Sequence, residues 1–192
     1  MTMEPKDRMP LIPREQMDEA QRAAADELIA GPRKAVKGPF IPLLRSPQLM
    51  ARLQKVGEYL RFESALPKRL NEFVTLVVSR EWTQQFEWFT HVPLALQAGT
   101  SAETINSLRE GRRPIEMSPE EEIAYDFTTE LLRNNGVSDA TYQVCVEMLG
   151  ERGVVDLIAL VGYFTTVSMV LNVAHTPPEP APGLNPLPPV PR

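Results

Sequence analysis

The sequence has a single cysteine, Cys145, among its 192 residues. One cysteine can form neither an intramolecular disulfide nor a Cys-x-x-Cys redox pair, and it cannot build a cysteine-rich zinc site. This usage is typical of a reducing compartment, and we expect a cytoplasmic protein. Because no histidine or basic residue lies near it in the sequence, we interpret Cys145 as a buried structural thiol.

The chain also lacks a cluster of positive charge. Its net charge is −5 and its basic residues are scattered, so nucleic acid is not a predicted partner. The first 20 residues contain no apolar segment of the kind that a secretory signal needs. The only long apolar run, residues 154–174, contains Asp156 and Asn172 and has no flanking positive cluster. We therefore predict a buried core or subunit-interface helix there, and no membrane span.

Strand patterns are almost absent, whereas helix start and stop signals recur along the chain. Seven or eight helices with short connections predict an all-α bundle, and we treat residues 1–175 as one domain. Helices are predicted over residues 13–30, 47–62 and 119–134. One helix opens at Pro67, one holds Phe86, Trp88 and His91 and ends at Gly99, and a short one runs from Thr100 to Gly111. A further helix begins at Ser138, and the long apolar helix follows Gly153.

Several local patterns set these boundaries. Thr100 with Glu103, and Ser118 with Glu121, form predicted capping boxes at the starts of two helices. Residues 31–47 hold four prolines and two glycines, which predicts an irregular crossing loop.

The C-terminal residues 176–192 hold eight prolines in 17 positions, which excludes helix and central strand. We predict an extended, polyproline-like arm. Two alternatives remain for this arm: it is a disordered end, or it docks along a neighbouring subunit through Leu184, Leu187 and Val190.

Candidate acid/base residues gather between Glu72 and His91, in a segment otherwise rich in apolar side chains. At roughly 100° per residue along a helix, Gln84, Glu87 and His91 share one face. Two antiparallel helices joined near Trp82 would return the Glu72 carboxylate to His91. This pattern predicts an imidazole whose tautomer and basicity are set by a carboxylate.

A second buried carboxylate would add a proton donor to the site, because two close glutamates cannot both ionise readily. The alternative is that Glu87 and His91, four residues apart, form an ordinary surface helix contact. Only two histidines are present, His91 and His175, and they are far apart in sequence. We therefore predict no metal site and no cofactor.

Four segments resemble the carboxymuconolactone decarboxylase family, which shares an all-α fold with the AhpD-like alkylhydroperoxidases. They are GPFIPLLRSPQL from Gly38, RFESALPKRLNEFVTLVVSREW, FEWFTHVPLALQAG and ERGVVDLIALVGYFTTVSMVLN. The resemblance covers roughly residues 38–173. It implies an AhpD-like bundle that assembles as a homo-oligomer, usually a trimer or hexamer.

The sequence departs from the AhpD-like peroxidases where their thiol pair lies. The family's glutamate matches Glu72 and its histidine matches His91, but the two cysteine positions hold Gln84 and Glu87. A thiol peroxidase needs a thiolate nucleophile and a resolving thiol, so peroxidase activity is expected to be absent. The resemblance then implies a lyase that decarboxylates or isomerises a small cyclic acid or lactone of aromatic compound catabolism.

The resemblance also assigns catalytic roles. His91 is the acid/base group and Glu72 orients it. A protonated Glu87, or Gln84, is the donor to the lactone oxygen. Two other functions stay open: an AhpD-like hydroperoxide reductase, and a family member that binds a small molecule without turnover.

Candidate substrate-binding residues complete this interpretation. Arg61 or Arg80 would anchor the substrate carboxylate, unless each forms only a surface or structural ion pair. Trp82 and Trp88 would wall the pocket and exclude water, unless they are plain core residues.

Overall fold

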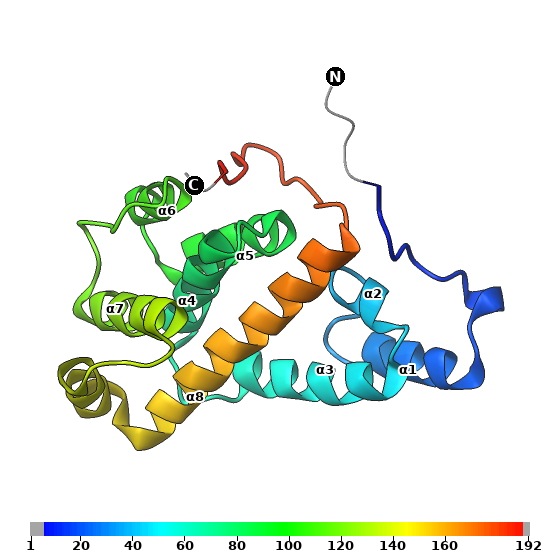
Figure 1. The fold of residues 1–192 in the computed structure, drawn as a ribbon, viewed down its shortest axis with the longest axis horizontal. Coiled ribbons are helices and arrows are strands. Elements are labelled where there is room, and N and C mark those ends of the chain that lie inside the picture. Colours follow the sequence, from blue (N-terminus) through cyan, green and yellow to red (C-terminus); the bar gives the residue numbers. More distant parts are fainter. Residues whose placement is uncertain (1–5, 190–192) are drawn as a thin grey trace.

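The computed structural model describes residues 6–189, which form eight α-helices and one short 3-10 helix and contain no β-strand (Figure 1). The predicted all-α bundle is therefore confirmed. In chain order the elements are η1 (Arg14–Gln16), α1 (Glu19–Ala30), α2 (Phe40–Leu43), α3 (Pro47–Phe62), α4 (Lys68–Glu81), α5 (Gln85–Ala98), α6 (Ala102–Arg109), α7 (Pro119–Asn134) and α8 (Asp139–Ala174).

The long helix α8 crosses the molecule diagonally, with α4 to α7 on one side and α1 to α3 on the other (Figure 1). The larger apolar core lies among α4, α5, α7 and α8. A smaller core joins α1, α2 and the start of α3. The two cores divide the molecule into two halves, one built on α1 to α3 and the other on α4 to α8. The candidate site lies where these halves meet.

The capping signals fix several helix boundaries. The bounds predicted for α3 and α7 are confirmed, and α7 begins with the predicted capping box of Ser118 and Glu121. The capping box predicted at Thr100 and Glu103 is wrong, because Ser101 caps α6 by accepting a hydrogen bond from Thr104. Thr100 instead donates its hydroxyl hydrogen to the buried Glu121 carboxylate, at 3.1 Å.

Two other segments differ from the sequence expectation. The first predicted helix is divided, because Asp18 caps α1 with a capping box of its own and η1 precedes it. The loop predicted over residues 31–47 contains the short helix α2, whose Phe40 and Leu43 are buried in the smaller core. Burial of these apolar side chains stabilises a helical turn between two proline-rich stretches.

Helix α8 is interrupted at Gly150, where φ is 69° and ψ is 167°, and not at Gly153 as predicted. A positive φ of this size is favourable for glycine alone, so the chain turns there at little cost. Asp156, the charge inside the apolar run, accepts hydrogen bonds from the Tyr59 hydroxyl and the Ala65 amide. Its buried carboxylate thus joins α8 to the α3–α4 connection.

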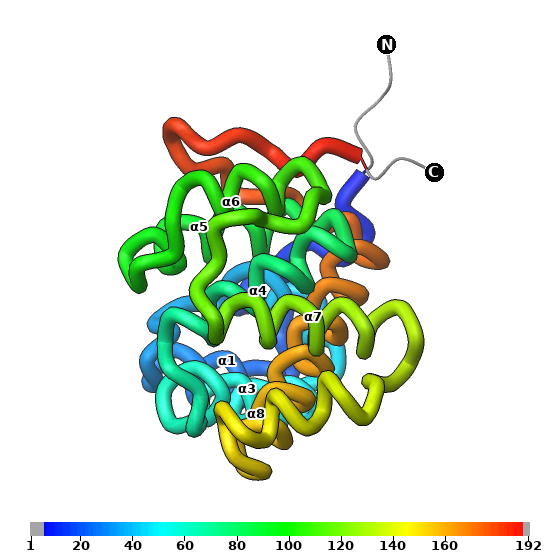
Figure 2. Tube along the Cα trace, turned by 90° about the vertical axis from the view of Figure 1, so that its left-hand side faces the viewer, coloured from blue at the N-terminus to red at the C-terminus, as the bar shows by residue number. Residues whose placement is uncertain are grey.

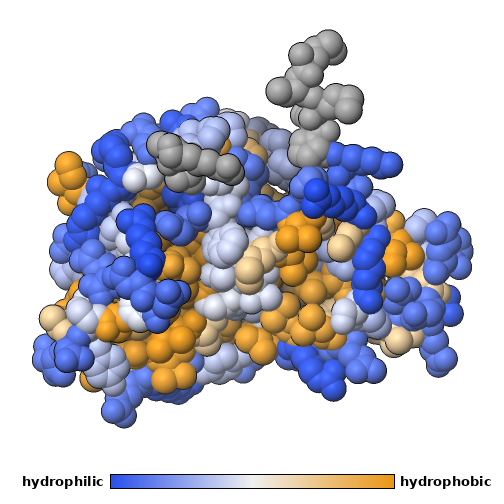
Figure 3. All heavy atoms as spheres, viewed as in Figure 1, coloured by the Kyte–Doolittle hydropathy of each residue, from blue (hydrophilic) through white to orange (hydrophobic). Residues whose placement is uncertain are grey.

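By length and composition α8 is the one helix among residues 6–189 that would be able to cross a membrane. In its most apolar window 56% of the residues are buried inside the protein, as in the central helix of a bundle. Its outward side still exposes Val155, Ile158, Met169 and Val173. Figure 3 shows apolar side chains gathered in a band on this face of the molecule.

The C-terminal arm, residues 176–189, runs back over α5 and α6, on the side of the molecule away from α1 and α3 (Figure 2). The Gln85 side-chain amide exchanges two hydrogen bonds, of 2.8 and 3.0 Å, with the backbone of Leu187. The Trp88 indole donates to the Asn185 carbonyl at 3.2 Å. The arm therefore docks on its own chain.

The arm is ordered over residues 176–189, in contrast to the alternative of a disordered end. Leu187 is buried in the larger core and the partly buried Leu184 packs against it, so both side chains contact their own chain. Val190, the third residue named for such a contact, lies outside the described residues.

Candidate active site

A buried imidazole lies between two carboxylates where α4 and α5 pack together. The chain turns back between the helices at Trp82, Thr83 and Gln84, so α5 returns along α4. His91 Nδ1 is 2.6 Å from Glu72 Oε2, and His91 Nε2 is 3.4 Å from Glu87 Oε2.

These contacts fix the orientation and the charge of the imidazole. Nδ1 donates its hydrogen to the Glu72 carboxylate, which leaves Nε2 on the side of Glu87. Burial alone lowers the pKa of His91, but hydrogen bonds and charge attraction from Glu72 and Glu87 outweigh it, and the pKa of His91 is raised. The Phe164 ring packs edge-on against the imidazole, with 5.1 Å between the ring centroids, and further restricts its orientation.

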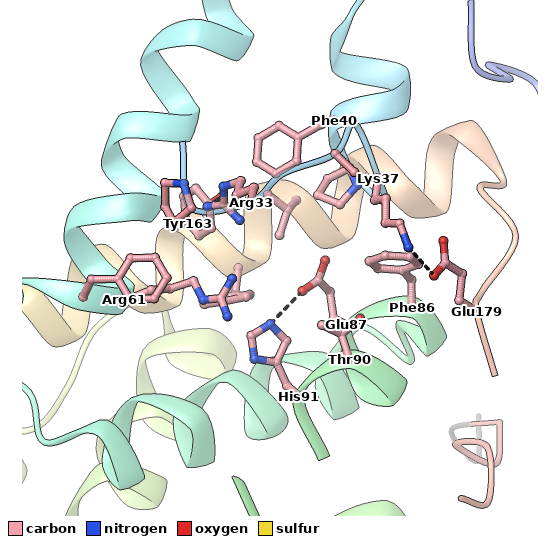
Figure 4. Close-up of a pocket in the computed structure, with 16 residues that line it drawn as sticks. Arg33, Lys37, Phe40, Arg61, Phe86, Glu87, Thr90, His91, Tyr163 and Glu179 are labelled. Atoms are coloured by element: carbon pink, nitrogen blue, oxygen red, sulfur yellow. Dashed lines mark hydrogen bonds and ion pairs between the residues drawn. The ribbon is translucent and has the colours of Figure 1, made fainter. Parts of the chain in front are cut away.

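A cavity of about 410 Å³ opens beside His91 and Glu87 (Figure 4). Its walls come from α2, α3, α5, α8, the loop before α2 and Glu179 of the C-terminal arm, so both halves of the molecule contribute to it. Glu72 does not line it and lies behind the imidazole. The arrangement resembles an acid/base site in which one carboxylate positions a histidine and a second faces the ligand.

Two arginines and Lys37 line this cavity, and Lys37 pairs with Glu179 of the C-terminal arm at 3.6 Å. Arg61, predicted as a substrate anchor, lines it, and its buried Nε has no hydrogen-bond partner within residues 6–189. Arg33 lies over the Phe40 ring, at 4.6 Å from its centroid, and its Nη2 is 3.4 Å from the Tyr163 hydroxyl. Burial lowers the pKa of Arg33 and raises that of Tyr163. Free guanidinium hydrogens in a half-buried cavity favour an anionic ligand.

Sequence reasoning missed Arg33 and Tyr163. Arg33 lies in the proline-rich loop, far in sequence from Glu72 and His91, and only the packing of α2 brings it near them. The sequence did contain an indication of Tyr163, because this residue places a hydroxyl inside an otherwise apolar helix. A buried tyrosine hydroxyl usually has a polar partner, which here is Arg33.

Gln84 is not part of the cavity, which corrects its predicted catalytic position. It precedes α5 as the N-cap, in an extended conformation, so it does not share the helix face of His91. Its side-chain oxygen accepts from the Phe86 amide at 2.6 Å, and its Nε2 donates to Asn172 at 2.7 Å. Gln84 therefore starts the helix and ties it to α8.

The other three predicted substrate-binding residues also lie elsewhere. Trp88 is buried in the larger core, and Trp82 packs against that core. Arg80 lines a different cavity, between α4, α7 and the α6–α7 loop. The apolar walls beside His91 are instead the rings of Phe40, Phe86, Phe62 and Phe164, as well as Val167.

The single cysteine lies in another part of the fold, outside the cavity beside His91. Cys145 is buried in α8, and burial raises the pKa of its thiol to about 11. Among residues 6–189 no group of three or more histidine, cysteine, aspartate or glutamate side chains is arranged to hold a metal ion.

The all-α fold is similar to that of the AhpD core. The structure is similar to one described as "Crystal structure of alkylhydroperoxidase AhpD core: uncharacterized peroxidase-related protein from Ralstonia eutropha JMP134", with a TM-score of 0.74 and 14% identity. The match covers 91% of this chain and 93% of that one. At this identity the similarity concerns the fold.

Residues 47–130 match the family model described as the carboxymuconolactone decarboxylase family. The matched region contains Glu72, Glu87 and His91, whereas Arg33 and Tyr163 lie outside it. No curated protein matches the chain.

Proposed function

We propose that this protein is a carboxymuconolactone decarboxylase-like lyase that acts by proton transfer on a small cyclic acid or lactone. The observation that carries the proposal is the buried imidazole of His91 between two carboxylates, at the wall of a cavity that also holds Arg33 and Arg61. The reaction needs no cofactor, because the chemistry is acid/base throughout.

The arginines anchor the substrate. A guanidinium group binds a carboxylate through two parallel hydrogen bonds, which fixes orientation as well as position. Arg61 and Arg33 lie on the side of the cavity opposite the helix that carries His91 (Figure 4). A substrate carboxylate bound there would direct the lactone ring toward the imidazole.

In the proposed step, the bond between the ring carbon and the departing carboxylate breaks and CO₂ leaves. The electron pair enters the conjugated lactone as an extended enolate, whose negative oxygen is stabilised by nearby donors such as the Tyr163 hydroxyl. The His91 imidazolium then gives the Nε2 proton to the distant carbon of the enolate. The neutral imidazole regains a proton from solvent.

Glu72 positions His91, and its negative charge keeps the imidazole protonated at higher pH. Glu87 lies beside His91 Nε2 at the cavity wall, where its carboxylate stabilises the protonated imidazole next to the substrate. The raised pKa of His91 matches a group that must be an acid near neutral pH.

The test compares two identical substitutions, His91→Asn and His175→Asn. 4-Carboxymuconolactone is the first substrate to assay, by CO₂ release. General acid/base catalysis typically contributes 10²- to 10⁴-fold, so we expect His91→Asn to lose about that factor in kcat. His175 ends α8 outside the cavity with a positive φ that asparagine tolerates, so its variant should keep full activity.

Full turnover in both His91→Asn and Glu72→Gln would contradict the catalytic assignment. Binding of lactones or aromatic acids without turnover, detected by thermal shift, would support the alternative of a non-catalytic binding protein.

The second candidate is a hydroperoxide reductase, favoured by the peroxidase-related description of the similar structure. A thiol with a pKa of about 11 is protonated near neutral pH and is a poor nucleophile, and Cys145 has no second cysteine to resolve an oxidised form. We therefore expect no reduction of hydroperoxide with a dithiol donor. Activity that is lost in Cys145→Ser would favour the reductase.

A further inference from the structure

Arg80 is buried, and no carboxylate among residues 6–189 pairs with it. Its exposed fraction is 7%, and its Nη1 donates to the Pro188 carbonyl of the C-terminal arm at 2.8 Å. Within residues 6–189 it forms no ion pair. Buried arginines are normally paired, because an uncompensated charge in the interior is costly. Burial, together with the nearby Arg109, lowers the pKa of Arg80, although the charge of Glu81 acts to raise it.

The acids around Arg80 already have partners. Glu81 pairs with Arg133 at 3.1 Å, and Glu110 pairs with Arg112 at 2.6 Å. All five side chains line one cavity of about 180 Å³ between α4, α7 and the α6–α7 loop. Three cations and two anions leave one positive charge unbalanced there, although the whole chain has a net charge of −5.

The free edge of Arg80 faces an open space above Gly111. A β-carbon at Gly111 would lie 3.2 Å from Nη2 and 3.4 Å from Nε of Arg80, so the missing side chain leaves this edge accessible. Gly111 also has a φ of +74°, which disfavours a side chain at that position. Nε and Nη2 form the fork that binds an oxyanion through two parallel hydrogen bonds. The Tyr125 and Thr129 side chains line the same cavity.

We propose that this cavity is a binding site for one small oxyanion, with Arg80 as the bidentate donor and Arg112 as a second cation. The ligand is a phosphate-type anion or the carboxylate of a small acid, since both present two oxygens to a guanidinium fork. The site is separate from the histidine cavity, because the two share no lining residue. Along α4, Arg80 lies about 12 Å beyond Glu72 at 1.5 Å per residue.

The test is a calorimetric titration with inorganic phosphate, and separately with acetate, at constant ionic strength. It uses the Arg33→Gln/Arg61→Gln variant, so that the histidine cavity no longer contributes an arginine site. We expect one bound anion per chain for at least one of the two probes. Adding Arg80→Lys, which keeps the charge but removes the fork, should weaken binding at least tenfold.

Two more variants make the result decisive. Arg112 is half exposed, so Arg112→Gln should fold normally. We expect it to weaken anion binding at least threefold. If Arg80→Lys does not fold, the Arg112→Gln result alone tests the proposal. Arg52→Gln removes an exposed arginine of α3 and should leave binding unchanged. The proposal is overturned if neither anion binds the Arg33→Gln/Arg61→Gln variant, or if binding persists unchanged in the Arg80 and Arg112 variants. The titration uses a variant that lacks both arginines of the histidine cavity. Its outcome therefore does not depend on whether the proposed lyase function is correct.

Discussion

At the scale of single residues, the imidazole of His91 is under two opposing influences. Burial disfavours its charged form, whereas Glu72 and Glu87 favour it, and the carboxylates outweigh burial. The same contacts therefore prepare a proton donor and contribute to the stability of the fold, and both effects depend on pH.

The raised pKa of His91 predicts a definite sign for the pH dependence of stability. The stabilising contribution is fully present below the unfolded value, near pH 6.5, and is lost as pH rises through the raised folded value. We expect the free energy of unfolding of the wild type to fall over this window. Urea unfolding at a series of pH values measures it.

In His91→Asn this decrease should be absent, whereas His175→Asn should retain it. A wild-type profile that rises across the same window would contradict the assignment of a charged, doubly paired imidazole.

The sequence predicted the three central site residues because helical spacing and one turn suffice to bring Glu72, Glu87 and His91 together. It misplaced Gln84, because the helix begins one residue later and an N-cap does not follow the helical repeat. Arg33 and Tyr163 depend on contacts between elements far apart in the chain, and periodicity carries no information on such contacts.

At the scale of elements, the C-terminal arm is an integral part of the fold although it has no regular structure. Its prolines hold the chain extended and remove backbone donors, and its remaining carbonyls accept hydrogen bonds from the side chains of Gln85, Trp88 and Arg80. Composition predicted the extended form, but it did not indicate the surface on which the arm docks.

Leu187 anchors this arm, since it is 4% exposed in the larger core. We expect Leu187→Ala to lower the free energy of unfolding by about 2 kcal/mol or more, and to make the arm sensitive to protease. Urea unfolding and limited proteolysis measure the two effects. Leu96→Ala, at a residue 42% exposed, is the matched control and should change stability by less than about 0.5 kcal/mol. Equal effects in the two variants would show that the arm is not anchored there.

At the scale of the whole molecule, the exposed apolar side of α8 bears on assembly. Val155, Ile158, Met169 and Val173 of this helix are exposed. Contiguous apolar surface of this kind is typical of protein interfaces. The homo-oligomer expected from the sequence, a trimer or hexamer, stays a prediction.

Light scattering after size exclusion tests this prediction. We expect the wild type to elute as an oligomer and Ile158→Glu to shift it toward the 21.6 kDa monomer, because a buried unpaired charge opposes association. Glu147→Gln, an exposed change elsewhere on α8, should leave the mass unchanged. A monomeric wild type would contradict the prediction.

The cavity beside His91 is assembled from three separate stretches of the chain. The proton-handling side chains fall within residues 47–130, while Arg33, Phe40 and Tyr163 are contributed from before and after that stretch. Arg61 and Phe62 also lie within residues 47–130, so only part of the recognition surface is encoded apart from the acid/base side chains. Relatives that retain the same imidazole and glutamates can diverge in the compounds they accept by changing only the loop ahead of α2 and one face of α8.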